Sequence, residues 1–322
     1  MSDLHNKEVA IEFYEHRYEE GYMEEWDDLK KNKVREVLKS IGLPQKGKAL
    51  DFGCGNGVFT NIMKNILPEW EVYGVEISKI AIQNASNKFP GCHFFIADET
   101  KNHEHQFDFL FSHHVIEHVQ DVDETFTFIN NYLKPSSSQL HILPCGNAGS
   151  FEYEICRLKK NGIEKEKGNR FFFEEPGHLQ RLTTTEFSHY ESKIGFTLQK
   201  EFYSNQYDGA IDWITKSSPR FVKRLTSTDD AVDDSSFHKL LLLRKKLLPM
   251  TYRQFAYSKY WEIKSKWNKK LKDYLALSML YIPAMLAKLF YYSVQQKAVN
   301  EWAVRKSDKN GSEMFLFFTR KP

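Results

Sequence analysis

The sequence predicts an α/β fold: a doubly wound, mostly parallel sheet of seven strands, with a helical insertion before the last strand. Short apolar runs alternate with helix-like segments from residue 47 onward, a pattern typical of repeated βαβ units. A turn with three glycines, ALDFGCGNG at 49–57, joins the first strand to a helix-like run. The last apolar run, EMFLFFT at 313–319, follows about a hundred residues of basic, helix-like sequence.

Each element follows from the spacing of its apolar residues. Strands are expected at 48–53, 71–77, 93–97, 107–112, 139–143, 196–203 and 313–319. Helices are expected at 7–21, 27–41, 57–67, 78–88, 122–133 and 183–194, with Ser78, Asp121 and Thr183 as N-terminal caps. The stretch 144–182 is expected to be irregular. In such a sheet, ligands bind beyond the carboxyl ends of the strands, where the strand order reverses.

Three regions are expected along the chain. Residues 1–46 form an N-terminal helical cap, residues 47–212 with 311–322 form the main α/β domain, and residues 213–310 form a basic helical insertion. The first helix carries an aromatic run, which either covers a ligand as a lid or packs on the domain: Phe13, Tyr14, Tyr18 and Tyr22.

Composition and charge restrict the class of protein. The 322 residues carry a net charge of +2, yet residues 213–310 hold 20 Lys and Arg against 8 Asp and Glu. This asymmetry indicates either an anionic partner or a solvated helical surface. The four cysteines show no CxxC pair, and the N-terminal stretch lacks the apolar segment of a signal peptide. Both features favour a cytoplasmic protein with reduced thiols.

The glycine turn has the chemistry of a ligand-binding loop. Gly53, Gly55 and Gly57 can adopt positive φ and expose bare backbone, and the following helix presents unpaired N–H groups to a carboxylate. Glu76 ends the second strand, where an acid can accept hydrogen bonds from a ribose diol. Asp98 and Glu99 end the third strand; they either accept from an adenine amine or are ordinary turn residues.

Four motifs together resemble a known family. LDFGCGNG at 50–57, GVEIS at 74–78, IAD at 96–98 and SHHVIEHVQD at 112–121 are similar, in order and spacing, to the class I S-adenosylmethionine-dependent methyltransferases. The chain most resembles the branch that contains ubiquinone-biosynthesis-type and other small-molecule, lipid and sugar methyltransferases. The resemblance covers about residues 45–203 and the last strand, and implies a Rossmann-like catalytic domain with S-adenosyl-L-methionine as cofactor.

The resemblance also implies roles for individual residues. One set would bind the cofactor. Asp51 would hold the methionyl ammonium, and the amides of Gly53, Cys54 and Gly55 would hold the methionyl part. Glu76 would bind the ribose, Ile77 would pack on the adenine face, and Asp98 with Glu99 would bind the adenine amine. His113 and His114 would form the wall beside the sulfonium. His118 and His178 are the candidate catalytic bases, since histidine accepts protons near neutral pH. For His118, a hydrogen bond to a backbone group is the competing interpretation. Arg181 could pair with an anionic substrate.

Three other functions compete with this interpretation. A nicotinamide dehydrogenase is disfavoured because the turn reads GxGxG rather than GxGxxG. The string His114-Val-Ile-Glu117-His118 matches the HxxEH zinc pattern, but the first histidine is expected at a strand end instead of on a continuous helix, so no metal is predicted. A non-catalytic module that keeps the fold is the alternative to an enzyme.

The insertion interleaves basic and apolar residues. The charge-free stretch YLALSMLYIPAMLA, at 274–287, is 14 residues long, shorter than the roughly twenty that a membrane span needs. Peripheral membrane contact, a helical cap and a dimer face remain open. No nucleic-acid recognition motif is present, so a nucleic-acid partner is not expected. The predicted reaction is O-methylation of a small-molecule, sugar or lipid-linked acceptor.

Overall fold

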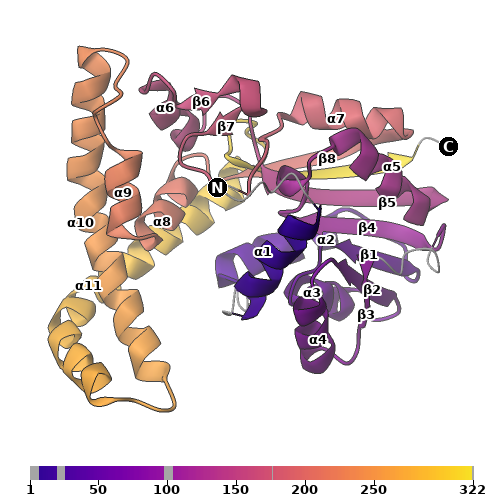
Figure 1. The fold of residues 1–322 in the computed structure, drawn as a ribbon, viewed down its shortest axis with the longest axis horizontal. Helices are drawn as coiled ribbons and strands as arrows, with labels where there is room; N and C mark the ends of the chain where they lie inside the picture. Colours follow the sequence, from indigo (N-terminus) through magenta and orange to yellow (C-terminus); the bar gives the residue numbers. More distant parts are fainter. Residues whose placement is uncertain (1–6, 20–25, 98–103, 176, 321–322) are drawn as a thin grey trace. The chain divides into compact units, whose positions relative to one another are not determined.

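The computed structural model describes residues 7–19, 26–97, 104–175 and 177–320. The chain divides into two compact units (Figure 1). Unit 1 consists of Met1–Pro144, Pro176–Glu201 and Met314–Pro322, and unit 2 of Cys145–Glu175 and Phe202–Glu313. The three regions expected from the sequence have other boundaries and stay a prediction.

A seven-stranded sheet forms the centre of unit 1, which confirms the predicted fold. Its strands are β1 (Lys48–Phe52), β2 (Glu71–Glu76), β3 (His93–Ile96), β4 (Phe107–His113), β5 (Leu133–Pro144), β8 (Phe196–Ser204) and β9 (Glu313–Arg320). They lie in the order β3-β2-β1-β4-β5-β9-β8. The pairs β1 with β2, β1 with β4, β2 with β3 and β4 with β5 are parallel. The side chains of Phe109, Leu110 and Phe111 are fully buried, as expected for a strand covered on both faces.

The strand order reverses between β1 and β4, and this reversal places the helices. The chain runs from β1 outward through β2 to β3, then returns to the other side of β1 for β4 and β5. Right-handed crossovers in opposite directions put helices on opposite faces of the sheet. Helices α3 (Val58–Ile66), α4 (Lys79–Lys88) and α5 (Val122–Tyr132) are such connections. The crevice at the reversal is the expected ligand site.

Most predicted element ends are correct to within a few residues. Ser78, Asp121 and Thr183 cap α4, α5 and α7 (Thr184–Lys193) as predicted, each accepting a backbone N–H with its side chain. Helices α1 (Lys7–Glu19) and α2 (Asp28–Ser40) also lie where the spacing puts them. The expected start of β5 is wrong: the strand begins at Leu133, six residues early, because the polar segment after α5 pairs with β4 through an irregular register.

A buried polar chain joins β4, β5 and α7. The Ser112 hydroxyl lies 2.7 Å from Nδ1 of His141, whose Nε2 lies 2.9 Å from Oε1 of Glu191, and Gln139 donates to the other carboxylate oxygen. The order of groups resembles a Ser-His-Glu catalytic triad. All four side chains are buried, so no substrate reaches Ser112, and the chain serves to satisfy polar groups inside unit 1.

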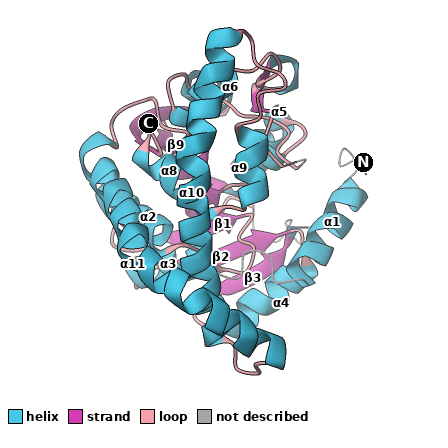
Figure 2. Cartoon of the chain, turned by 90° about the vertical axis from the view of Figure 1, so that its left-hand side faces the viewer, coloured by secondary structure: helices cyan, strands magenta, loops and turns pink. Residues whose placement is uncertain are grey.

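Unit 2 is mainly helical. It contains α6 (Phe151–Arg157), β6 (Ile163–Glu164), β7 (Arg170–Phe171), α8 (Asp208–Lys216), α9 (Pro219–Leu225), α10 (Asp234–Ser265) and α11 (Leu271–Arg305). Figure 2 shows α10 and α11 as two long helices that pack on each other. The stretch 144–182, expected to be irregular, therefore holds helix α6 and the short hairpin of β6 and β7. Ser150 caps this helix, and Ile155 and Cys156 bury its apolar face.

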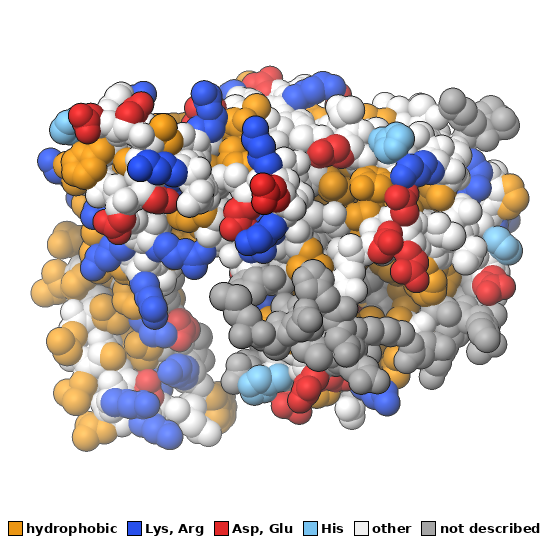
Figure 3. Space-filling view, turned by 45° about the horizontal axis from the view of Figure 1, so that its top comes forward, with side chains coloured by type: hydrophobic (Ala, Val, Ile, Leu, Met, Phe, Trp, Pro, Cys, Tyr) orange, Lys and Arg blue, Asp and Glu red, His pale blue; other side chains and the backbone are white. Residues whose placement is uncertain are grey.

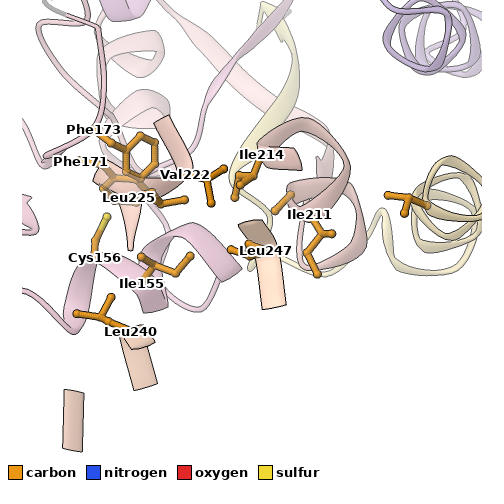
Figure 4. Close-up of a cluster of buried hydrophobic side chains, with 12 residues drawn as sticks. Ile155, Cys156, Phe171, Phe173, Ile211, Ile214, Val222, Leu225, Leu240 and Leu247 are labelled. Carbon is orange, nitrogen blue, oxygen red and sulfur yellow. The ribbon is translucent and has the colours of Figure 1, made fainter. Parts of the chain in front are cut away.

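The core of unit 2 joins residues far apart in the sequence (Figure 4). Ile155 and Phe171 lie in one cluster with Ile214, Val222 and Leu247. At the end of α8, which has no side-chain cap of its own, Glu301 of α11 accepts the N–H groups of Tyr207, Asp208 and Gly209 at 2.6–3.0 Å. A carboxylate at a helix N-terminus is favourable because it meets unpaired donors and the positive end of the helix dipole.

Candidate active site

A cavity of about 600 Å³ lies at the carboxyl ends of β1, β2 and β4, within the range of small-molecule sites. Every described residue of the predicted cofactor set lines it: Asp51, Gly53, Cys54, Gly55, Glu76, Ile77, His113 and His114. Asp98 and Glu99 lie outside the described residues. The predicted roles of these side chains stay predictions.

The glycine turn forms one wall of the cavity. Gly53, Gly55 and Gly57 have φ of 74°, 49° and 76°, values that residues with a Cβ rarely adopt. The amides of Gly53 and Cys54 both donate to the Val75 carbonyl, at 2.9 and 3.0 Å, which ties the turn to β2. A Cβ on Gly53 would lie 2.4 Å from a methyl of Val115. The turn therefore requires glycine for packing as well as for backbone geometry.

Two acids, Asp51 and the half-buried Glu76, stand at separate points of this wall. Asp51 is 2% exposed and accepts a hydrogen bond of 2.6 Å from the Thr60 hydroxyl. Burial raises its pKa to about 7, although the Thr60 hydrogen bond opposes this shift. Glu76 accepts the N–H groups of Gly55 and Ile77 at 3.1 and 2.7 Å. Burial also raises the pKa of Glu76, against the effect of these hydrogen bonds.

Aromatic side chains form much of the remaining wall. His113 packs against Phe59 and Trp26, with ring centroids 4.1 and 4.7 Å apart. Burial holds the pKa of His113 well below its usual value, so the ring is neutral at pH 7. Its Nε2 is buried with no hydrogen-bond partner in the described part of the chain. Such an orphaned polar atom beside a cavity indicates that a ligand completes the site.

His114 bends the chain away from the sheet. Its φ is +55°, and its N–H donates to the Ile142 carbonyl at 2.8 Å. Its Nδ1 lies 2.8 Å from Oε1 of Glu117, whose side chain is 1% exposed. The HxxEH string therefore does not lie on one continuous helix, because β4 ends at His113 and a 3-10 helix covers only Ile116–His118.

His118 also lines the cavity. Its Nδ1 lies 2.9 Å from the carbonyl oxygen of Gly177. A carbonyl can only accept, so Nδ1 carries the proton and Nε2 carries the lone pair of the neutral ring. Burial lowers the pKa of His118, although the charge of Glu117 opposes this effect. The backbone contact of the competing interpretation is thus present, and it leaves the second nitrogen available as a base.

The segment after Gly177 holds this histidine in place. The N–H of Leu179 donates to the Glu117 carbonyl at 2.8 Å, and the Gln180 side chain donates to the carbonyls of Ile116 and Val119. His178 is not among the residues that line the cavity, but its ring packs edge-on against His118 at 4.7 Å. The structure therefore brings the two candidate bases together and gives only His118 direct access.

Glu117, His118 and His178 could also hold a metal ion. One donor atom from each lies within 4.8 Å of the others. One carboxylate and two imidazoles suit zinc or a similar metal. The sequence predicts no metal here, and that expectation stays a prediction.

The cavity is also lined by aromatic residues outside the predicted cofactor set. Tyr14 and Tyr18 belong to the aromatic run expected to form either a lid or packing; both line the cavity, and Tyr18 is also buried. Trp26, Phe59 and Phe128 also line it and were not predicted. Aromatic residues in helices and loops resemble core residues in a sequence, and no local pattern distinguishes the two.

A cationic ligand fits this cavity. Its charged described lining residues are the acids Asp51, Glu76 and Glu124, with no lysine or arginine among them. S-adenosylmethionine carries a sulfonium and an ammonium, and its ribose offers hydroxyl donors to a buried acid. The bare turn, the two separated acids and the aromatic wall therefore fit this cofactor.

Comparison with known proteins decides the family, because a model of the methyltransferase domain matches residues 15–201. The chain belongs to the methyltransferase-domain family. The match is to a methyltransferase domain, as the resemblance to the class I methyltransferases implied. The finer placement in the ubiquinone-biosynthesis-type branch does not follow from this match.

Individual relatives of this methyltransferase match about half of the chain. Protein 235L of Invertebrate iridescent virus 6, named as a methyltransferase, is 24% identical over 169 residues, 52% of this chain and 62% of the viral protein. Phosphoethanolamine N-methyltransferase 1 of Zea mays is 27% identical over 171 residues, 51% of this chain and 33% of the maize enzyme. The match thus spans less than two thirds of either relative.

Solved methyltransferases are more distant. A phosphoethanolamine N-methyltransferase 2 of Haemonchus contortus, solved with S-adenosyl-L-methionine, is 16% identical, and the alignment covers 90% of this chain and 53% of that one. Its TM-score is 0.47, which is too low to transfer any detail of its site.

Proposed function

We propose that this methyltransferase methylates a hydroxyl oxygen of an uncharged small molecule, sugar or lipid-linked acceptor, as in the branch that includes the ubiquinone-biosynthesis-type enzymes. One observation carries the proposal: His118 lines the cavity, and its hydrogen bond to Gly177 leaves the lone pair on Nε2. A hydroxyl is a poor nucleophile unless a base takes its proton during the attack.

In the proposed mechanism, His118 acts as the general base. S-adenosylmethionine supplies an electrophilic methyl group when bound. His118 would accept the hydroxyl proton at Nε2 while the acceptor oxygen takes the methyl group that the cofactor supplies. Burial lowers the pKa of this ring, so the free base is present at pH 7. Alignment of the reacting atoms supplies much of the acceleration.

The cofactor would be held by the residues already described. Asp51 would bind the ammonium, the bare backbone of the glycine turn would lie against the methionyl part, and Glu76 would bind the ribose hydroxyls. Neutral His113 would face the region of the sulfonium without repelling it, because burial keeps its pKa low. These roles would explain why Asp51 is buried in the wall of the cavity and why Glu76 is held by backbone donors.

The charge of the cavity supports an uncharged acceptor. No lysine or arginine occurs among its described lining residues. A phosphate or carboxylate bound there would face Asp51 and Glu76 and would meet no lysine or arginine among the described lining residues, which costs binding energy.

An amine is the second candidate acceptor. The maize relative, 27% identical over 171 residues, is named for phosphoethanolamine N-methylation. An amine needs no general base once it is deprotonated, so the two candidates differ in their dependence on His118.

Isotope labelling and a histidine variant test the proposal. The full chain is incubated with methyl-deuterated S-adenosylmethionine and a metabolite and lipid extract from cells that lack the gene, and labelled products are identified by mass spectrometry. We expect an O-methyl product. We also expect His118→Asn to lower kcat by about a hundredfold or more, the usual contribution of a general base, with loss of the acidic limb of the pH profile.

Two controls keep the outcomes separate. Binding of S-adenosylhomocysteine should be unchanged in His118→Asn, which shows that the cavity is intact. His189→Asn replaces an exposed histidine on α7 and should leave kcat unchanged. An N-methyl product, or a His118→Asn variant with full activity, would contradict O-methylation with His118 as base.

A further inference from the structure

The outer face of α11 carries a continuous apolar stripe. The stripe recurs every three or four residues and consists of Leu271, Leu275, Met279, Ile282, Leu286 and Leu289, each 58–83% exposed. At 1.5 Å per residue it is about 27 Å long. The opposite face of the helix packs into unit 2 through Ala284, Ala287 and Val294. Exposed apolar patches of this extent mark interaction surfaces.

The charges around the stripe are almost all positive. The turn between α10 and α11, with the residues that flank it, spans 259–273 and holds six lysines and two acids. Both acids are engaged, Glu262 by Lys259 and Asp273 by Lys266. Trp267, at this turn, is 96% exposed. Residues 274–300 contain two lysines and no acid. On the left of Figure 3, apolar and basic side chains gather over α10 and α11.

We propose that α11 and the α10–α11 turn bind the surface of an anionic lipid bilayer. The stripe would lie among the headgroups and upper acyl chains, Trp267 would sit at the interface, and the lysines would meet lipid phosphates. A second copy of the chain is a poorer occupant, because residues 274–300 offer no acid to the lysines of a partner. The inference does not depend on which acceptor the enzyme methylates.

The contacts between α10 and α11 favour an α11 that lies on the membrane over one that crosses it. By length and composition alone, α11 could span a bilayer: its most apolar window has a mean hydropathy of 1.4 and is 11% buried. The helix is thus longer than the charge-free stretch of 14 residues from which the sequence indicated a segment too short to span. However, α10 packs beside it, with the Tyr257 and Tyr291 ring centroids 4.3 Å apart and the Arg253 guanidinium 5.1 Å from the Phe290 ring. A crossing α11 would carry Arg253 into the hydrocarbon, which is costly.

Cosedimentation of the full chain with vesicles tests the proposal. One vesicle is phosphatidylcholine alone, and the other contains phosphatidylglycerol in addition. We expect binding to the anionic vesicle, little binding to the neutral one, and a loss with added salt. The double variant Ile282→Glu with Leu286→Glu should reduce the partition coefficient at least tenfold. Gln296→Glu adds a negative charge to an exposed position of α11 beyond the stripe and should change it far less.

Further measurements test whether the variants fold, whether the stripe forms a dimer, and whether α11 crosses the membrane. Thermal unfolding and S-adenosylhomocysteine binding should be the same in all variants, since the replaced side chains are exposed. The proposal is overturned if the wild-type chain fails to bind anionic vesicles at low salt, or if the double variant binds as well as wild type. It is also overturned if the stripe variants convert a dimer to a monomer without affecting vesicle binding, or if bound protein resists extraction by alkaline carbonate.

Discussion

Gly53 combines two constraints that the sequence shows only as one glycine in a turn. Its φ of +74° is strained for any residue with a side chain, and a Cβ would meet Val115 at 2.4 Å. Gly42 separates the two effects. Its φ is +75°, but a Cβ there would meet no described atom within 4 Å beyond its chain neighbours. A comparison of the same substitution at Gly42 and at Gly53 therefore isolates the effect of the Cβ contact, because the two positions share the left-handed backbone.

We expect Gly42→Ala to cost about 1–2 kcal/mol of stability, from the left-handed backbone, with unchanged affinity for S-adenosylhomocysteine. Gly53→Ala should cost more and weaken that affinity at least tenfold, because relief of the clash displaces the turn that lines the cavity. Thermal unfolding and calorimetry measure both quantities. Equal effects of the two substitutions on ligand affinity would show that the Val115 contact has no role in shaping the site.

Asp51 links cofactor binding to pH. Burial raises its pKa to about 7 in the free protein, and a bound ammonium would lower it. Binding below pH 7 therefore releases a proton, so the dissociation constant should fall as the pH rises from about 5.5 to about 7, by up to tenfold per pH unit, and then level off. Calorimetry with S-adenosylhomocysteine across this range measures the slope.

Asp51→Asn provides the control for this pH dependence. The amide has the same shape but does not titrate, so the variant should bind more weakly at pH 7 and lose most of the slope. An equal slope in the variant would assign the proton to another group such as Glu76, and a wild-type affinity that does not vary with pH would contradict the proton release itself.

At the scale of elements, Glu301 stabilises unit 2 by replacing the cap that α8 lacks. Its carboxylate is 5% exposed and accepts three backbone N–H groups. Hydrogen bonds to a charged group contribute about 1.5–3 kcal/mol. We expect Glu301→Ala to lower stability by at least that amount, and Glu301→Gln by less, because its carbonyl still accepts.

Chemical denaturation with circular dichroism measures these losses. Glu262→Gln is the matched control: Glu262 lies on α10 and its 2.7 Å pair with Lys259 is exposed, so its contribution should be close to zero. If Glu301→Ala unfolds at the same denaturant concentration as Glu262→Gln, the capping contact does not stabilise unit 2.

Across the molecule, local sequence patterns predict the strands of the sheet and the N-terminal caps of the helices well. Strand positions follow from short apolar runs, and Ser78 and Thr183 cap helices by contacts within three residues. The start of β5 could not be predicted in this way, since residues 133–138 join the sheet by pairing with β4 and carry no strand pattern of their own. Long-range pairing overrides local propensity there.

The candidate site was predictable only where its chemistry follows from sequence motifs. Asp51, Glu76 and His118 stand at strand ends or in motifs that the family resemblance marks. Trp26 and Phe59 line the same cavity, but which aromatic side chains face a cavity depends on tertiary packing. The exposed stripe of α11 was also invisible, because its leucines look like core residues until the structure shows that one face has no cover among the described residues.

The glycine turn and Glu76 are together proposed to hold the adenosyl cofactor. Calorimetric titration of S-adenosylhomocysteine into wild type, Glu76→Ala and Glu71→Ala tests this role directly. Glu71 is the control, since it begins the same strand but is exposed and pairs with Lys48. We expect one site per chain, Glu76→Ala to weaken binding by about 10- to 100-fold, and Glu71→Ala to match wild type. An unchanged dissociation constant in Glu76→Ala, or no binding to the wild-type chain, would contradict this role of the glycine turn and Glu76.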